Sequence, residues 1–301
     1  MKMNGERGGD MSQTTGTKPQ AITLTAADGY PIGATRFQAS GRVVAHLIVA
    51  GATGVPQGFY RHFAQFAATG GFSTLTFDYR GIGASRRGRL KGFKADFLDW
   101  AQLDLGAAVE AMVDEKVPLF MVGHSFAGHA FGLLPNHHRV RGFYTFGSGS
   151  GWHGWMSRIE GLKVLLLWTF VCPPMARWYG YLPMARLGMG ENLPLGVYRQ
   201  WRRWCRFPGY FFDDPAVADQ MRQKFARIKT PITAANSLDD AWITPRARDA
   251  FMSGYRNTRV ERLDIDPAPF GGLGHMGYFR PGAQPLWREA LEWFQTQSSM
   301  I

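Results

Sequence analysis

The chain carries the sequence Gly-His-Ser-Phe-Ala-Gly at residues 123–128, between an apolar run at 118–122 and an apolar stretch at 126–134. The first run is typical of a buried strand and the second of a helix, which places Ser125 on a sharp turn from strand to helix. A serine on such a turn presents its hydroxyl at the edge of the sheet, and small residues two positions before and after it prevent clashes between neighbouring chains. The pattern therefore predicts that Ser125 is a nucleophile.

A second serine-containing stretch competes with this one. Residues 147–151 read Gly-Ser-Gly-Ser-Gly, which is typical of a flexible loop. No serine other than Ser125 has glycine two residues before it and glycine or alanine two residues after it. We therefore interpret 147–151 as a loop that enters an insertion.

Strand and helix patterns alternate around the serine. Two short strands flank a turn near the N-terminus, and near-continuous apolar runs farther along are typical of strands buried on both faces of a parallel sheet. Strands are expected at 22–25, 32–37, 43–50, 72–78, 118–122, 142–146, 231–235 and 260–265, with helices at 59–69, 98–112, 126–134 and 284–296. This order predicts an α/β fold with a mostly parallel sheet and helices on both faces.

The alternation breaks in the middle of the chain. From 149 to 229 the sequence is rich in Trp, Tyr, Arg, Gly and Pro and contains no clear strand. We therefore expect a disordered tail at 1–20, a core built from 21–148 and 230–301, and a cap inserted at 149–229.

Composition limits the class of protein. The 301 residues are 45% apolar and 19% charged, as expected of a globular chain. The two cysteines form no disulfide framework, and no metal-ligand spacing occurs. The N-terminus lacks the apolar segment of a signal peptide, and the longest apolar run, 164–172, is shorter than a membrane span. We expect a soluble, cytoplasmic protein without metal or cofactor.

The net charge of +11 raises nucleic acid or an anionic membrane as a partner. The basic residues are scattered, however, and no nucleic-acid-binding motif accompanies them. We expect no nucleic-acid partner, and the sequence makes no prediction about oligomeric state.

These motifs resemble those of the α/β-hydrolase superfamily, in particular a bacterial branch of serine hydrolases that includes esterase-like and lipase-like proteins. Besides the turn at Ser125, residues 78–85 (Asp-Tyr-Arg-Gly-Ile-Gly-Ala-Ser) look like the superfamily's Asp-x-Arg-Gly-x-Gly-x-Ser turn. Residues 51–55 follow the third strand, where the superfamily has its oxyanion loop. The resemblance covers about 20–148 and 230–297.

The resemblance implies a catalytic triad in the order nucleophile, acid, histidine. His275 is the one histidine after the strand at 231–235, and it lies in a glycine-rich loop after the last strand. The acid is expected in the loop after the seventh strand, which contains Asp239 and Asp240. Because the second aspartate of such a pair often acts in the superfamily, Asp240 is the preferred acid and Asp239 the alternative.

The same resemblance implies an oxyanion hole formed by two backbone N–H groups. The first belongs to Phe126, directly after the nucleophile, and the second to Ala52, with Thr53 as the alternative. The predicted function is hydrolysis of a carboxylic ester or thioester through an acyl-enzyme intermediate. The expected partner is a small-molecule acyl substrate.

The cap leaves two questions open. Its aromatic residues either line an apolar substrate pocket or pack the cap onto the core; they are Trp152, Trp155, Trp168, Trp178, Tyr179, Tyr181, Tyr198, Trp201 and Trp204. Four arginines, at 199, 202, 203 and 206, either meet an anionic group of a ligand or form the solvated face of a helix.

Two other functions fit the same residues. An acyltransferase would use an identical triad and pass the acyl group to an alcohol or amine. A non-catalytic ligand-binding protein on a hydrolase scaffold would instead contact an anionic membrane through its basic, aromatic cap.

Overall fold

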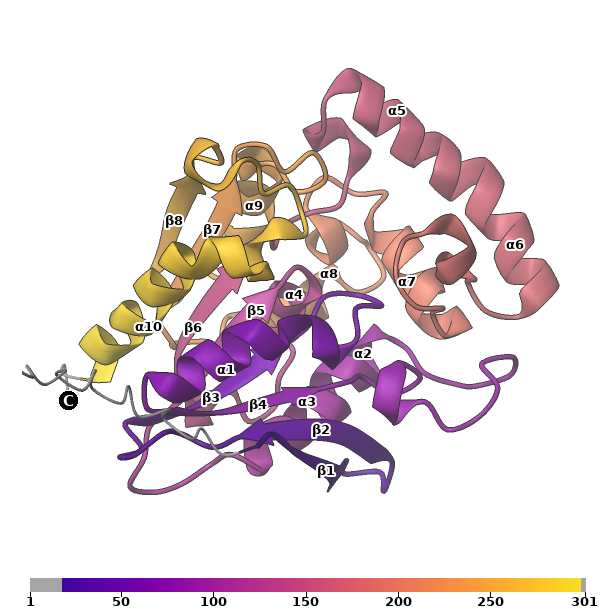
Figure 1. Cartoon of the computed structure of the whole chain (residues 1–301). Helices are drawn as coiled ribbons and strands as arrows, with labels where there is room; N and C mark the ends of the chain where they lie inside the picture. Colours follow the sequence, from indigo (N-terminus) through magenta and orange to yellow (C-terminus); the bar gives the residue numbers. More distant parts are fainter. Residues whose placement is uncertain (1–17, 299–301) are drawn as a thin grey trace, which may run out of the picture.

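The computed structural model describes residues 18–298 and contains one eight-stranded sheet (Figure 1). The strand order is β1-β2-β4-β3-β5-β6-β7-β8; β2 pairs antiparallel with β1 and β4, and the other neighbours are parallel. The strands are β1 (Gln20–Thr25), β2 (Pro31–Phe37), β3 (Ala45–Ala50), β4 (Phe72–Phe77), β5 (Leu119–His124), β6 (Val140–Phe146), β7 (Ile232–Ser237) and β8 (Val260–Ile265). The predicted fold class is confirmed. Of the expected tail, residues 1–17 lie outside the described residues.

Helices cover both faces of the sheet. On one face α1 packs against β4 and α10 against β6, and on the other α3 packs against β3, α4 against β5, and α9 against β7 and β8. The bounds are α1 (Arg61–Thr69), α2 (Phe97–Asp99), α3 (Leu105–Glu110), α4 (Phe126–Phe131), α9 (Pro245–Met252) and α10 (Gln284–Ser298). A π-helical turn, Trp100–Asp104, joins α2 to α3, so the helix expected at 98–112 is present but irregular.

The chain between β6 and β7 forms a group of helices that lies beyond the carboxyl ends of the strands (Figure 1). These helices are α5 (Arg158–Leu166), α6 (Cys172–Tyr179), α7 (Leu195–Trp204) and α8 (Ala218–Phe225). We refer to residues 149–229 as the cap. It adds no strand to the sheet, and among the described residues its only β pairing is an isolated bridge between Leu182 and Leu193.

The cap contains one long helix that the sequence analysis did not predict. A π-helical turn, Leu167–Val171, joins α5 to α6, and the resulting helix runs over 22 residues from Arg158 to Tyr179. By length and composition it is the one helix among residues 18–298 that is apolar enough to cross a membrane. The apolar run at 164–172 forms its centre, and helix continues beyond that run at both ends.

Charged side chains fix the turn after β4. Arg80 donates to Asp104, whose side chain is fully buried, at 2.7 Å, and to Asp28 at 2.6 Å. The Asp78 carboxylate accepts hydrogen bonds from the backbone N–H groups of Gln57 and Ala84, at 2.7 and 2.8 Å. These bonds tie the Asp-x-Arg-Gly turn to the π-helical turn before α3 and to the chain that follows residues 51–55.

The buried ion pair gives a first prediction. Arg80→Met should lower the free energy of unfolding by about 3–5 kcal/mol, because it leaves the Asp104 carboxylate buried without its partner. Arg86→Met, at an exposed position in the same turn, is the control and should change stability by less than about 0.5 kcal/mol. Denaturant unfolding of the two variants measures the difference. Equal stabilities would contradict a structural role for the Arg80–Asp104 pair.

Candidate active site

Ser125 lies at the turn between β5 and α4 in a backbone conformation that few non-glycine residues adopt. Its φ is +52° and its ψ −103°, and its N–H donates to the Phe146 carbonyl at 2.9 Å. The flanking small residues make this turn possible: a Cβ on Gly123 would lie 2.8 Å from the Ala127 Cβ. A strained residue held by its surroundings is typical of a functional site.

The Ser125 hydroxyl forms one end of a chain of hydrogen bonds. His275 Nε2 lies 3.0 Å from Ser125 Oγ, and His275 Nδ1 lies 2.8 Å from Asp240 Oδ2. Because a carboxylate only accepts hydrogen bonds, Nδ1 carries the imidazole proton and Nε2 is free to accept the serine proton. The structure therefore brings together the three residues that the sequence proposed as nucleophile, base and acid.

Asp240 is oriented by several donors. Its side chain is fully buried, and its Oδ1 accepts from the backbone N–H groups of Trp242 and Ile243 at 3.0 and 2.9 Å. The Tyr278 hydroxyl donates to Oδ2 at 3.3 Å. These contacts hold the carboxylate toward the histidine. The sequence analysis did not identify Tyr278, since a single tyrosine in a loop has no motif that marks it.

Asp239, the alternative acid, contacts a different partner. It accepts from the Ser237 hydroxyl at 2.6 Å and from the backbone N–H groups of Leu273 and Gly274, both at 2.9 Å. Partial burial acts to raise the pKa of Asp239, but these three hydrogen bonds outweigh it and lower the pKa below its ordinary value. Asp239 therefore fastens the glycine-rich loop that carries His275, and it makes no hydrogen bond to the imidazole.

The expected oxyanion donor Ala52 is already engaged. Its N–H donates to the Tyr60 hydroxyl at 2.8 Å and so does not point free into the cavity. The backbone N–H groups of Thr53 and Phe126 have no hydrogen-bond partner among the described residues. Both residues line the same cavity as Ser125. Of the two residues expected for the second oxyanion donor, Thr53, the alternative, therefore has the unpaired N–H, and Ala52 does not.

A second hydrogen-bond chain runs behind the site. Tyr60 Oη lies 3.0 Å from His124 Nδ1, and His124 Nε2 lies 2.9 Å from the His275 carbonyl. Burial, with a smaller contribution from His275, lowers the pKa of His124 to about 3, so that ring is neutral at physiological pH. Since a carbonyl only accepts, Nε2 donates to His275 and Nδ1 accepts from Tyr60. One chain of bonds therefore connects the oxyanion loop to the histidine loop.

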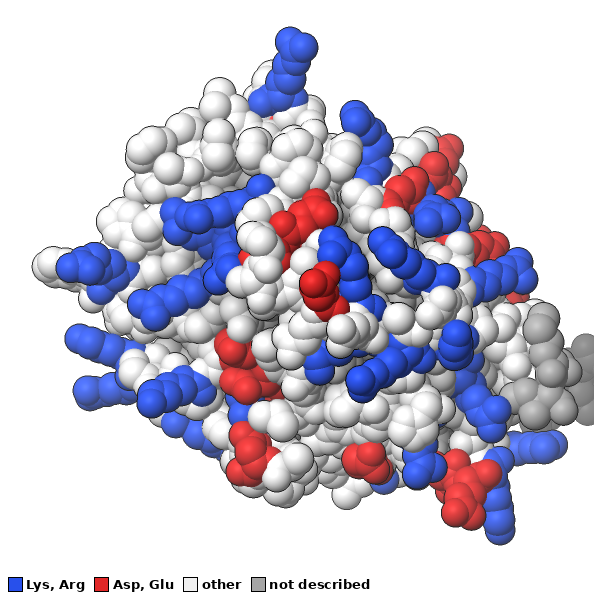
Figure 2. All heavy atoms as spheres, turned by 180° about the vertical axis from the view of Figure 1, so that it is seen from behind, with Lys and Arg blue, Asp and Glu red and all other residues white. Residues whose placement is uncertain are grey.

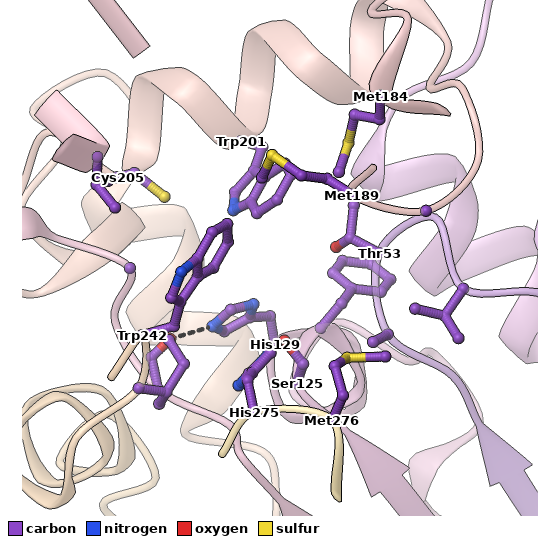
Figure 3. A pocket seen from close by; sticks show the side chains of 18 of the residues that line it. Thr53, Ser125, His129, Met184, Met189, Trp201, Cys205, Trp242, His275 and Met276 are labelled. Atoms are coloured by element: carbon purple, nitrogen blue, oxygen red, sulfur yellow. Dashed lines mark hydrogen bonds between the residues drawn. The ribbon is translucent and has the colours of Figure 1, made fainter. Parts of the chain in front are cut away.

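Ser125 faces an apolar cavity of about 320 Å³ between the sheet and the cap (Figure 3). Ser125 and His275 lie on one side of it, and Met184, Met189 and Trp201 lie across from them. His129 points into the cavity and is hydrogen-bonded to the Gly149 carbonyl at 2.8 Å, and burial lowers its pKa to about 4.

The aromatic residues of the cap divide between the two expected roles. Trp168 and Trp201 line the cavity, whereas Trp204 is buried against Tyr210 and Phe211. Trp178 neither lines the cavity nor packs the cap onto the core, because 82% of its surface is exposed.

The four cap arginines lie outside the cavity and around a shallow hollow on the cap surface. Arg203 pairs with the buried Asp214 carboxylate at 2.5 Å, and Arg202 donates to the Trp168 carbonyl at 2.7 Å. No cluster of His, Cys, Asp and Glu suited to a metal ion occurs within residues 18–298.

Known structures share this architecture at low sequence identity. No protein-family model and no curated protein sequence matches the chain. A monoglyceride lipase from Saccharomyces cerevisiae aligns with a TM-score of 0.65 and 14% identity over 96% of this chain and 99% of that one. An esterase from Pyrococcus furiosus aligns with a TM-score of 0.61 and 12% identity over 98% and 96%.

A haloalkane dehalogenase from Bradyrhizobium elkanii aligns with a TM-score of 0.60 and 13% identity over 94% of this chain and 98% of that one. The neighbours thus include enzymes with different chemistry on one scaffold. Together they show that this chain has the α/β-hydrolase fold.

The contacts of Asp239 predict a pH-dependent stability. Asp239→Asn should lower Tm by a few degrees at neutral pH, because an amide is a weaker acceptor for Ser237, Leu273 and Gly274. The pKa of Asp239 is lower in the folded than in the unfolded protein. Its stabilising effect is therefore complete above the unfolded value, about 3.9, and is lost as pH falls toward the folded one.

Thermal unfolding of wild type and variant between neutral pH and about pH 3.5 measures this effect. The Tm difference should shrink as pH falls. Asp219→Asn, at an exposed carboxylate on α8, is the control and should show a small difference at every pH. A Tm difference for Asp239→Asn that grows on acidification would contradict the assignment.

Proposed function

We propose that this protein is a serine hydrolase that cleaves an apolar carboxylic ester or thioester. The observation that carries the proposal is the continuous chain of hydrogen bonds from Ser125 through His275 to the buried Asp240, at the floor of an apolar cavity. Hydrolases on the same scaffold are consistent with it. The triad supplies acyl transfer without a cofactor.

In the first half of the reaction, His275 Nε2 takes the Ser125 proton while Oγ attacks the acyl carbonyl carbon. Asp240 keeps the proton on Nδ1 and stabilises the imidazolium. The negative charge on the carbonyl oxygen develops near the unpaired N–H groups of Phe126 and Thr53. When the tetrahedral intermediate collapses, Nε2 returns the proton to the leaving alcohol or thiol, and the acyl group remains on Oγ.

The second half repeats these steps with water. His275 removes a proton from a water molecule, the resulting hydroxide attacks the acyl-enzyme, and Oγ leaves with the proton from Nε2. The product is a carboxylic acid, and Ser125 is regenerated. An acceptor alcohol or amine at the same place would give acyl transfer instead, so only the products distinguish the two reactions.

The lining of the cavity supports an apolar acyl group. Four methionines, Met156, Met184, Met189 and Met276, adapt to chains of different shape, and Trp168 and Trp201 provide rigid apolar walls. The volume of about 320 Å³ is at the lower end for small-molecule sites, which favours short or medium acyl chains.

A fluorophosphonate probe tests the nucleophile. The purified wild-type protein should gain one adduct by intact mass, because an activated serine attacks the phosphorus atom, and Ser125→Ala should gain none. A folded wild type that stays unlabelled beside a reactive control hydrolase would contradict the proposal. If labelling succeeds, product analysis with water and with added alcohols or amines separates hydrolysis from acyl transfer.

The apolar wall predicts a change in chain-length preference. Trp201→Ala removes an indole from the cavity lining, so kcat/KM for longer acyl esters should rise relative to short ones by about tenfold. Rates are measured with monomeric esters of increasing chain length. Trp178→Ala, an exposed position outside the cavity, is the matched control and should leave the preference unchanged. An unchanged preference in Trp201→Ala would exclude this wall from acyl-group selection.

A further inference from the structure

The long cap helix, Arg158–Tyr179, has an apolar inner face and an apolar outer face. On the inner face Val164, Cys172 and Ala176 are buried against the cap, and Val164 and Trp168 also line the cavity above Ser125. Only 28% of its most apolar segment is buried. The helix therefore closes the site on one side and leaves a second apolar surface uncovered.

The outer face concentrates the exposed apolar surface of the protein. Seven of the ten large hydrophobic side chains that are exposed among the described residues belong to this one helix. They are Ile159, Leu162, Leu165, Leu166, Phe170, Val171 and Trp178. We call these seven residues the outer face. Exposed apolar side chains gathered on one helix in this way are typical of a site of contact with a protein or a membrane.

The part of the cap that carries the outer face is rich in cations, and Arg202 and Arg206 lie beside Leu165 and Thr169 of the helix. Residues 158–206 contain eight Lys or Arg and only two Asp or Glu. Both acids are engaged, since Glu160 pairs with Lys163 at 3.3 Å and Glu191 accepts from the Gly83 N–H at 2.9 Å. Figure 2 shows Lys and Arg side chains projecting on the side of the molecule that carries the cap, beside broad uncharged surface.

The positive charge of the cap distinguishes between two partners that could bind the outer face, a second copy of the chain and a lipid surface. A second copy of the chain would bring a like set of cations against the first, which opposes association. An anionic lipid surface instead offers apolar chains to the helix and negative headgroups to the surrounding arginines. Because the inner face is packed on the cap, the helix fits a position along the surface of a bilayer rather than across it.

A side hollow lies beside the cavity, between the long cap helix and two of the cap arginines. It is lined by Leu165 and Thr169 of the helix and by Arg202 and Arg206 of the cap. It also shares Gly151, Val164, Trp168 and Cys205 with the cavity that holds Ser125. The hollow and the cavity are therefore neighbours that have these four lining residues in common. An acyl chain could thus pass from the outer face to the nucleophile with little exposure to water.

We propose that the outer face docks the protein onto an anionic lipid surface, with the apolar side chains in the headgroup–acyl boundary and the cap arginines at the level of the lipid phosphates. The side hollow then opens toward the lipid and admits an acyl chain to the cavity. Docking itself depends only on the helix and the arginines, and does not depend on the proposed hydrolase activity.

Cosedimentation of the full chain with vesicles tests the proposal. Wild type should bind vesicles of phosphatidylcholine mixed with phosphatidylglycerol much more tightly than vesicles of phosphatidylcholine alone, and added salt should weaken binding. Leu162→Glu/Phe170→Glu should raise Kd for the mixed vesicles by at least about tenfold, because it places two carboxylates in the outer face.

Controls separate docking from folding and from catalysis. Leu238→Glu changes a leucine of nearly equal exposure, 58% against 57% for Leu162, and should bind vesicles as wild type does. Ser125→Ala should also bind as wild type does. Circular dichroism and fluorophosphonate labelling of the double variant check its fold. Vesicle binding without labelling of wild type would refute the proposed function and leave docking intact.

Three outcomes would overturn the docking proposal. The first is equal binding of wild type to neutral and anionic vesicles, and the second is unchanged binding of a folded Leu162→Glu/Phe170→Glu variant. The third is self-association of wild type without lipid, measured by light scattering, that the double variant abolishes while wild type binds no vesicles. That result would assign the outer face to a second copy of the chain.

Discussion

The backbone of Ser125 is the constraint on which the site depends. At φ +52° it turns the chain from β5 into α4, and the bond from its N–H to the Phe146 carbonyl fixes the turn against β6. Because β3, β5, β7 and β8 are parallel, the loops after them emerge at the same edge of the sheet. Those loops carry Thr53, Ser125, Asp240 and His275.

Hydrogen bonds on the side away from the cavity also hold these loops in place. Asp239 fastens the backbone of the histidine loop, and the chain from Ala52 through Tyr60 and His124 reaches the carbonyl of His275 itself. The neutral state of His124 makes each donor and acceptor in this chain unambiguous. The distance from Ser125 to His275 is therefore set by a scaffold of bonds that takes no part in proton transfer.

The sequence was informative where a local pattern reports burial. The apolar runs of β3, β4 and β5 predicted a parallel sheet, since strands covered on both faces have no polar side. The structure of the cap was harder to predict, because its aromatic residues and arginines follow no single period. Some of them line the cavity, others are buried in the cap, and others are exposed. The helix over Arg158–Tyr179 was not predicted, since its apolar residues lie on both faces and a π-helical turn interrupts it.

At the site, the order of residues in the sequence suggested which loops meet, but not which residue of each loop makes which hydrogen bond. Neither the choice between Asp239 and Asp240 nor that between Ala52 and Thr53 is visible in spacing. Both depend on long-range partners, namely the N–H groups of the histidine loop and the Tyr60 hydroxyl. Such partners are not encoded in any short motif.

The two-faced cap helix also has a consequence for sequence divergence. Positions only a few residues apart on Arg158–Tyr179 contact either the cavity or the outside. An insertion or deletion of one residue would turn all later positions by about 100° around the helix axis and move both sets off their faces. Substitutions leave every position on its face of the helix, whereas insertions and deletions do not. We therefore expect homologous chains to vary in residue type along this helix and to preserve its length, with gaps in alignments falling in the loops that flank it.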